Sequence, residues 1–350
     1  MARIAVVSSH PPFTEGGHLV IGRSLVAALR DAGHEAELVL TPQNRFGRQA
    51  AAYAATWLTD LEESDGRRID QVVSLRFPAY AVRHPRQVCW LNHTMREYYD
   101  QWPAFAAALS GPGRLKERVR RAIVHAADRR LLGPARMARL FAQSRTIASR
   151  LREHLGLAAD VLYPPPPPRR YRTDRFGDYV FAVSRLTPLK RIDLLVRALS
   201  EPAAAGVRCT IAGDGEEAGR IRQLVRDHGL ASRVTLLGAV DSATLVSRLA
   251  ACRAVVFPAF DEDYGLVTVE AFASGKAVVT CRDSGGPAEL VRDGETGLLC
   301  DPSPASLAEA LARLASDRGL AEKLGAGAAA ASRDISWPRT IERLLLQDGR

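Results

Sequence analysis

Five consecutive prolines at residues 164–168 constrain the fold of this chain more than any other feature. Proline fixes φ and has no amide hydrogen, so the run cannot lie inside a helix or a central strand. It forms a stiff extended spacer of about 3.1 Å per residue, or a ligand for a proline-binding domain. The run falls near the middle of 350 residues, a length typical of about two domains. We therefore predict domains over 1–168 and 169–334, and a helix within 335–350 that packs back on the first domain.

Short runs of β-branched and other apolar residues alternate with longer segments of helical periodicity. The predicted strands are 3–8, 35–40, 71–75 and 87–91 in the first half, and 179–184, 207–212, 234–237, 254–257, 277–280 and 297–300 in the second. The predicted helices are 17–32, 192–200, 216–228, 242–251, 266–274, 287–291, 304–316 and 337–346. Such alternation indicates an α/β fold in which each domain is a doubly wound, Rossmann-like parallel sheet.

Composition and cysteine usage exclude several classes of protein. With 47% hydrophobic and 25% charged residues, the chain is neither disordered, collagen-like nor a coiled coil. No run approaches the ~20 apolar residues that cross a bilayer, and the first residues resemble a buried strand rather than a signal peptide. The five scattered cysteines contain no CxxC pair, which favours free thiols in a reducing compartment. We therefore expect a cytoplasmic protein.

The net charge of +9 is concentrated in residues 114–152, where twelve Lys and Arg residues face only Glu117 and Asp128. This excess predicts an anionic partner or a solvated cationic helical face. Two interpretations stay open. The helices are exposed and have no partner, or they make peripheral contact with the anionic inner face of the cytoplasmic membrane. Nucleic-acid binding is disfavoured because Phe141 is the one aromatic residue in the stretch.

Ligands of open parallel sheets bind beyond the carboxyl ends of the strands, and several loops at such ends carry suitable residues. Residues 8–17 end in Gly16 and Gly17 at a helix start, where backbone amides can approach an anion, although such pairs often mark simple turns. Residues 184–191 contain Arg185 and Lys190, two cations able to neutralise a diphosphate, or a solvated basic loop.

Two further strand-end segments carry titratable side chains. Glu262 and Asp263 lie near a helix start, where capping alone could explain them. Glu270 lies among apolar residues, so its carboxylate needs a partner, and ribose hydroxyls would serve. His93 follows the predicted strand 87–91 and is either a structural histidine or a residue of the reacting centre. The aromatic residues of 95–102 could stack on a sugar or pack in the core.

Three segments in order, 186–191, 211–215 and 262–271, resemble the retaining glycosyltransferases of family 4. Their signature is two glutamates separated by seven residues with a glycine and an alanine in set places, here Glu262, Gly265, Glu270 and Ala271. The resemblance implies the GT-B fold, two facing Rossmann-like domains with a cleft between them. The first domain would bind the acceptor and the second the nucleotide-sugar donor. The departure is Asp263, where many relatives have glycine.

The resemblance also implies roles for individual residues. Arg185 and Lys190 would bind the diphosphate of the donor, and Glu270 its ribose. The residues expected around the transferred sugar are Glu262, Asp263, Tyr264, Gly265, Leu266 and Val267, the last five through their backbone. Gly16 and Gly17 would supply amides from the first domain. Gly238 and Val240 would lie beside the base, and His93 near the reacting centre.

The implied reaction is transfer of a sugar, with retention of configuration, from a UDP- or GDP-linked donor to an acceptor hydroxyl. The acceptor would be a glycan, a glycolipid or a small natural product. The nucleotide sugar is then a co-substrate, and no metal is expected because no DxD pair occupies a suitable loop. The alternative is a nucleotide-sugar epimerase or a phosphorylase on the same architecture.

Overall fold

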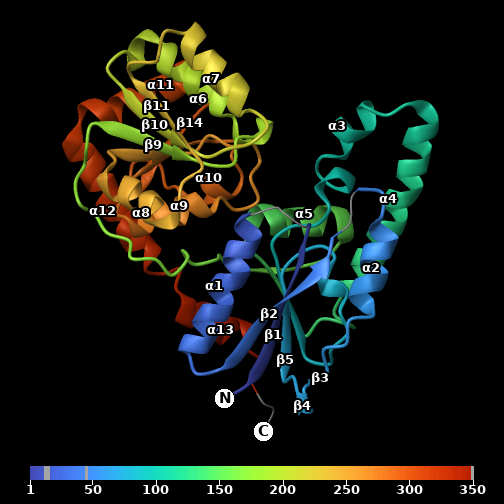
Figure 1. Ribbon diagram of the computed structural model, residues 1–350. Coiled ribbons are helices and arrows are strands. Elements are labelled where there is room, and N and C mark those ends of the chain that lie inside the picture. Colours follow the sequence, from blue (N-terminus) through green and yellow to red (C-terminus); the bar gives the residue numbers. More distant parts are fainter. Residues whose placement is uncertain (12–15, 44–45, 348–350) are drawn as a thin grey trace. The chain divides into compact units, whose positions relative to one another are not determined.

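The computed structural model describes residues 1–11, 16–43 and 46–347. It divides into two compact units, each built on a six-stranded parallel sheet (Figure 1). The first unit is Met1–Pro168 together with the segment that begins at Trp337, and the second is Arg169–Ser336. The chain therefore crosses between the units directly after the last proline of the run, and crosses back before the final helix.

In the first unit the sheet order is β2-β1-β5-β6-β7-β8. Its strands are β1 (Arg3–His10), β2 (Glu35–Pro42), β5 (Gln71–Ser74), β6 (Gln87–Leu91), β7 (Arg139–Ala142) and β8 (Asp160–Val161). A separate antiparallel pair is formed by β3 (Glu63–Ser64) and β4 (Arg67–Arg68). Every residue of β5 and β6 is buried, as expected for central parallel strands that are covered on both faces.

The helices of the first unit are α1 (Gly17–Asp31), α2 (Gln49–Trp57), α3 (Trp102–Ala107), α4 (Gly111–Leu131), α5 (Arg145–Leu155) and α13 (Trp337–Leu344), with 3₁₀ turns η1 (Ala79–Ala81) and η2 (Arg96–Tyr98). Helices α1, α2 and α5 contact the strands of this sheet. The last helix, α13, is held by hydrogen bonds from the Trp337 indole to the Pro166 carbonyl at 3.0 Å and from Gln71 Nε2 to the Leu344 carbonyl at 2.8 Å. The C-terminal helix thus belongs to the first unit.

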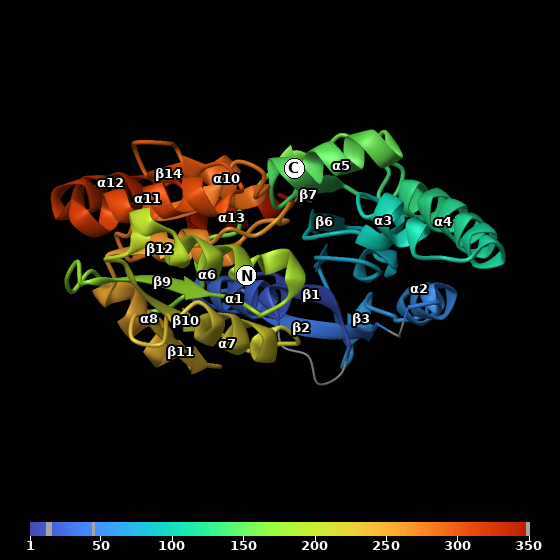
Figure 2. The same cartoon turned by 90° about the horizontal axis from the view of Figure 1, so that it is seen from above.

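The second unit has the sheet order β11-β10-β9-β12-β13-β14, and Figure 2 shows these strands following one another across it. Its strands are β9 (Tyr179–Val183), β10 (Arg208–Ala212), β11 (Val234–Gly238), β12 (Ala254–Val256), β13 (Val278–Cys281) and β14 (Gly297–Cys300). Its helices are α6 (Ile192–Ser200), α7 (Ala218–Asp227), α8 (Ser242–Ala251), α9 (Leu266–Ala273), α10 (Gly286–Leu290), α11 (Pro304–Ser316) and α12 (Arg318–Ser332), with 3₁₀ turns η3 (Pro188–Lys190) and η4 (Pro202–Ala204). The predicted α/β class and doubly wound sheets are confirmed.

Strands β9 and β12 are neighbours in the second sheet although two strands separate them in sequence. The strand order therefore reverses between them, and the crevice beyond their carboxyl ends is where ligands bind in open α/β sheets. The loops that follow β9 and β12 carry Lys190 and Glu262. The topology alone singles out these two loops.

The basic stretch 114–152 differs from the expectation of helices throughout. It includes most of α4, the strand β7 and most of α5, and Phe141 lies in the buried second half of that strand at 2% exposure. Several of its arginines are used within the unit: Arg121 Nε donates to the Tyr98 carbonyl at 2.7 Å, and Arg139 Nη1 donates to the Arg343 carbonyl at 2.9 Å. None of the described helices is long and apolar enough to cross a bilayer.

A buried polar cluster joins α4 to α2, to η1 and to the residue after η2 in the first unit. The Asp128 carboxylate is fully buried and accepts hydrogen bonds from the hydroxyls of Tyr53, Tyr80 and Tyr99. Tyr99 and the neighbouring Tyr98 are 2% and 0% exposed, so these two aromatic side chains of 95–102 pack in the core. Burial raises the pKa of Asp128 to about 6, against the lowering effect of the three hydroxyls.

Candidate functional site

The loops after β9 and β12 bring together a cation and an anion at the carboxyl edge of the second sheet. Lys190 Nζ forms an ion pair with Glu262 Oε2, and both side chains are about one-fifth exposed. Lys190 Nζ also lies 5.5 Å from the centre of the Phe257 ring. The Phe260 amide donates to the Leu189 carbonyl at 2.7 Å, which ties the two loops to each other. Two of the predicted site residues are therefore in contact.

The loop that follows β13 holds the backbone of Glu262 in place. The Glu262 amide donates to the Ser284 carbonyl at 3.0 Å, and the Gly286 amide donates to the Glu262 carbonyl at 2.8 Å. Only glycine fits at 286, because a Cβ there would lie 2.5 Å from the Tyr264 Cα. Sequence reasoning missed this loop, although the Ser-Gly-Gly-Pro run at 284–287 directly after a predicted strand was a usable signal.

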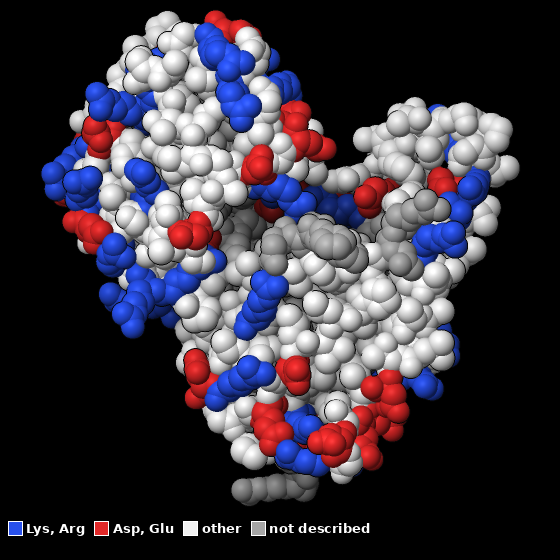
Figure 3. Space-filling model, in the orientation of Figure 1, with Lys and Arg blue, Asp and Glu red and all other residues white. Residues whose placement is uncertain are grey.

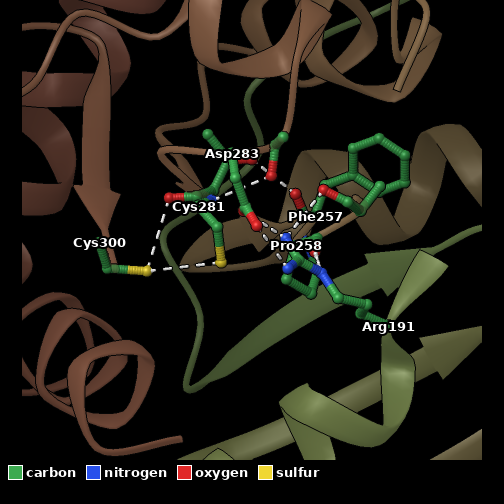
Figure 4. Close-up of polar contacts among 9 residues, drawn as sticks. Arg191, Phe257, Pro258, Cys281, Asp283 and Cys300 are labelled. Carbon is green, nitrogen blue, oxygen red and sulfur yellow. Dashed lines mark hydrogen bonds and ion pairs between the residues drawn. The ribbon is translucent and has the colours of Figure 1, made fainter. Parts of the chain in front are cut away.

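Arg191 joins the three loops into one scaffold (Figure 4). Its guanidinium donates to both carboxylate oxygens of Asp283 at 2.6 and 2.9 Å, and to the carbonyls of Pro258 and Ala259 at 2.7 and 3.1 Å. The same view shows Cys281 and Cys300 side by side on neighbouring strands, with 3.9 Å between their sulfur atoms. Arg191 is thus a structural cation, whereas its neighbour Lys190 is directed to Glu262.

Helix α9 begins at the end of the acidic loop and carries Glu270. Gly265 precedes the helix with φ of 76°, and a Cβ there would lie 2.6 Å from Pro287 Cγ, so both its conformation and its surroundings require glycine. Val267, Val269 and Ala271 are buried although they point to different sides of α9, so the helix is covered on nearly all sides. Glu270 is consequently only 5% exposed, as its apolar sequence context predicts.

The partners of Glu270 come from the segment directly after the proline run. Arg169 Nη1 forms an ion pair with Glu270 Oε1, and the Tyr171 hydroxyl donates to the same oxygen at 3.0 Å. Burial raises the pKa of Glu270, and the Arg169 charge and the Tyr171 hydrogen bond oppose that rise. Neither partner was a predicted site residue. The adjacent arginines 169 and 170, directly after a rigid spacer, were the available signal.

The other predicted residues of the second unit lie along the same sheet edge. Arg185 follows β9 and is exposed, and its guanidinium makes no hydrogen bond or ion pair with the described part of the chain. Gly238 ends β11, and its carbonyl accepts the Gly213 amide at 2.7 Å. Val240 packs against the apolar cluster that contains Phe257 and Val267. Asp263, Tyr264 and Leu266 complete the turn into α9.

The predicted residues of the first unit follow its own strands. Gly16 is the cap residue before α1, and its carbonyl accepts the Leu19 amide at 3.0 Å. Gly17 has open space where a side chain would project, and residues 12–15 of this predicted loop lie outside the described residues. His93 follows β6, and its Nδ1 lies 2.7 Å from the Thr94 carbonyl. It lines a cavity of about 10 Å³, room for one water at most.

Among residues 1–11, 16–43 and 46–347, no group of three or more His, Cys, Asp or Glu side chains is arranged to hold a metal ion. The predicted cations at this edge of the second sheet are Arg185 and Lys190, and the predicted carboxylates are Glu262 and Glu270. Of these four side chains, Lys190 and Glu262 form an ion pair with each other.

The chain is similar to known proteins over much of its length. Residues 172–331 match the family model described as "Glycosyl transferases group 1". An exopolysaccharide phosphotransferase of Streptomyces coelicolor is 37% identical over 183 residues, which are 50% of this chain and 19% of that protein. A D-inositol 3-phosphate glycosyltransferase of Nocardia farcinica is 38% identical over 174 residues, 47% of this chain and 38% of that protein. The chain therefore spans well under half the length of these two relatives.

The crystal structure of the Anabaena protein HepE in complex with UDP and glucose is similar over 97% of both chains, with a TM-score of 0.72 and 19% identity. That likeness extends over both units. It shows that the chain shares the GT-B fold, as the sequence resemblance implied.

Proposed function

We propose that this chain, whose second unit is a group 1 glycosyltransferase domain, transfers a sugar from a nucleoside-diphosphate sugar to an acceptor hydroxyl with retention of configuration. The observation that carries the proposal is the pairing of Lys190 with Glu262 at the point where the strand order reverses, with Glu270 eight residues further along the chain. The complex of HepE with UDP and glucose supports a uridine nucleotide as the donor's leaving group. GDP-linked sugars are the other candidates.

The proposed donor site follows from the chemistry of each side chain. Arg185 and Lys190 bind the diphosphate, and Glu270 accepts hydrogen bonds from the ribose. Glu262 and the backbone of 263–267 hold the sugar, and Gly238 and Val240 lie beside the base. Lys190 and Glu262 form an ion pair with each other. In the proposed mechanism, donor binding exchanges that ion pair for contacts to phosphate and sugar.

Bond breaking places negative charge on the leaving diphosphate. The bond between the anomeric carbon and the diphosphate oxygen breaks, and a bond from that carbon to the acceptor oxygen forms on the same face. The acceptor's proton passes to an oxygen of the departing diphosphate. Lys190 and Arg185 stabilise the negative charge that develops on the diphosphate. Such electrostatic stabilisation is usually the largest single contribution to the rate. For Gly16, Gly17 and His93 of the first unit, the roles that the family resemblance implies stay predictions.

A donor and acceptor screen tests the proposal. Calorimetric titration with UDP, GDP and ADP, followed by incubation of the corresponding sugars with mono- and oligosaccharides, should reveal one nucleotide that binds and one that supports transfer. The anomeric configuration of the product, read by NMR, tests retention. Addition of EDTA should leave the rate unchanged, because the two cationic side chains take the role of a metal. Conversion of the donor alone, without acceptor, would instead identify an epimerase.

We also propose that α4 contacts an anionic membrane surface. Leu115, Val119 and Ile123 recur every four residues on one face of this helix and are 65%, 55% and 63% exposed. Exposed Lys116, Arg118 and Arg130 belong to the same helix. In Figure 3, uncharged residues cover most of the surface around α3 and α4, and Lys and Arg side chains border them. An apolar row flanked by cations fits the headgroup region of anionic lipid.

Vesicle sedimentation tests this surface. Wild-type protein should sediment with vesicles that contain phosphatidylglycerol and not with phosphatidylcholine alone, and raised salt should weaken binding. The double variant Val119→Ser and Ile123→Ser should lose sedimentation. Leu58→Ser is the matched control, because Leu58 is 73% exposed elsewhere in the first unit. Binding that neither salt nor the double variant alters would disprove the proposal.

A further inference from the structure

We propose that Arg169 and Tyr171 are positioning residues of the nucleotide site, which occupy Oε1 of Glu270 and leave Oε2 to accept the ribose hydroxyls. This inference rests on the proposed function, because it takes Glu270 as the ribose acceptor. It adds the segment after the proline run to the donor site. Both residues precede position 172, where the match to the family model begins.

The two contacts fall on one atom of the carboxylate. Arg169 Nη1 and the Tyr171 hydroxyl both donate to Oε1 of Glu270. Within the described chain, Oε2 accepts no hydrogen bond, and no other charged side chain forms an ion pair with Glu270. Ionised carboxylates accept through both oxygens, so an almost buried carboxylate with one oxygen unused has capacity for a ligand.

The segment that carries Arg169 and Tyr171 is anchored along its length. The Thr173 hydroxyl donates to the Ser274 carbonyl at 2.8 Å, just beyond the end of α9. The Asp174 and Gly177 amides donate to the carbonyls of Ala250 and Ala251, both at 3.0 Å. Lys276 Nζ donates to the Arg175 carbonyl at 2.6 Å. Because these bonds fix the backbone at successive positions, the two side chains meet Glu270 from a defined direction.

Arg169 also favours the ionised form of Glu270. Burial raises the pKa of the Glu270 carboxyl, and the nearby guanidinium offsets part of that rise. An ionised carboxylate is the stronger acceptor for hydroxyl groups. Removal of Arg169 therefore has two consequences for the site: Glu270 loses its fixed orientation, and its protonated form becomes more populated. Both weaken the same interaction with ribose.

The experiment compares two ligands on five proteins. Wild type, Arg169→Ala, Arg169→Lys, Tyr171→Phe and Arg172→Ala are titrated calorimetrically with UDP or GDP, whichever wild type binds more tightly, and with its 2′,3′-dideoxy analogue. Arg172→Ala is the matched control. The substitution removes the same charge from the same segment, and within the described chain the Arg172 side chain pairs with exposed Asp174. Thermal unfolding of each variant checks that it is folded.

We expect Arg169→Ala to bind the ribose form about tenfold more weakly and Tyr171→Phe about threefold. The dideoxy analogue should bind wild type and both variants equally. The deficit of Arg169→Ala should grow as the pH falls, because its Glu270 is protonated at higher pH than in wild type. Arg169→Lys should be intermediate, and Arg172→Ala should match wild type.

The possible failures are distinct. If wild type binds neither UDP nor GDP, the proposed function fails before any variant is compared. If wild type binds but Arg169→Ala loses equal affinity for both ligands, or none, the positioning role is wrong. Should Arg169→Ala fail to fold, Tyr171→Phe with the same two ligands decides, because it removes one hydroxyl and leaves the charge in place.

Discussion

Two buried carboxylates, one in each unit, are satisfied in different ways. Asp128 is 0% exposed and uses both oxygens, with Tyr53 and Tyr80 on Oδ1 and Tyr99 on Oδ2. Glu270 is 5% exposed and has both of its partners on Oε1.

The difference teaches how to tell a structural acid from a binding acid. Asp128 is surrounded by neutral hydroxyls and no cation forms an ion pair with it in the described chain, so its environment suits burial in the core. Glu270 has a guanidinium that favours its ionised form, and its Oε2 accepts no hydrogen bond from the described chain. Asp128 and Glu270 therefore differ in how many of their carboxylate oxygens accept hydrogen bonds, and not in how deeply they are buried.

Asp128→Ala should lower the free energy of unfolding of the first unit by about 4 kcal/mol, because it leaves three buried tyrosine hydroxyls without an acceptor. All four tryptophans lie in the first unit, at positions 57, 90, 102 and 337, so denaturant unfolding followed by tryptophan fluorescence reports on that unit. Nucleotide affinity should not change in molecules that remain folded. An unaltered unfolding midpoint would show that Asp128 is not the structural acid.

Stability of the first unit should fall as pH rises from about 4 to about 6. The folded state raises the pKa of Asp128 from 3.8 to about 6, so the proton is bound more tightly in the native state. The proton's contribution to the free energy of unfolding is complete below the unfolded-state pKa of 3.8 and is lost as the pH rises through the folded-state pKa of about 6. The change is about 3 kcal/mol. Tryptophan-monitored unfolding of wild type should show this slope relative to Asp128→Asn, which has no proton to lose. Parallel curves would contradict the prediction.

Lys190→Ala should lower turnover by a hundredfold or more, since it removes one preorganised cation from the leaving group. Thermal unfolding should be measured beside turnover, because the substitution leaves the Glu262 carboxylate, about one-fifth exposed, without its ion-pair partner. Lys323→Ala, at an exposed position of the same unit, is the control. Wild-type turnover in the Lys190 variant would remove the residue from the proposed mechanism.

Glu270→Gln should weaken binding of the ribose nucleotide by about tenfold, and Glu270→Ala by at least as much. The amide keeps the shape of the side chain but replaces one acceptor oxygen with a donor, so the second unit should stay folded in thermal unfolding by circular dichroism. Calorimetry with the ribose and dideoxy nucleotides provides the measurement. A large loss of stability with unchanged affinity would place Glu270 with Asp128 among the structural acids.

Sequence reasoning recovered what depends on local order. Parallel strands end at one sheet edge, so the loops that carry Lys190 and Glu262 could be placed near each other without coordinates. The apolar neighbours of Glu270 likewise predicted its burial.

Contacts between distant residues could not be predicted in the same way. Arg169 and Tyr171 are 101 and 99 residues from Glu270, and no periodicity links them. Strand β7 was hidden by its basic neighbours, because Arg139 stands at its exposed first position. Helix α12, rich in alanine and glycine, lacks the apolar periodicity that marks the other helices. In each case the structure is determined by tertiary contacts, which the local sequence pattern does not reveal.

The hydrogen bond from Trp337 to Pro166 has a topological consequence. The chain leaves the first unit after Pro168 and returns to it at Trp337, and the hydrogen bond holds these two positions close together. Residues 169–336 are therefore an insertion between two adjacent points of an otherwise continuous Rossmann-like unit. A deletion that removes α13 is therefore damage to the N-terminal unit. It would strip Gln71 of β5 of its bonds to Leu344 and Leu346 and leave the inserted unit intact.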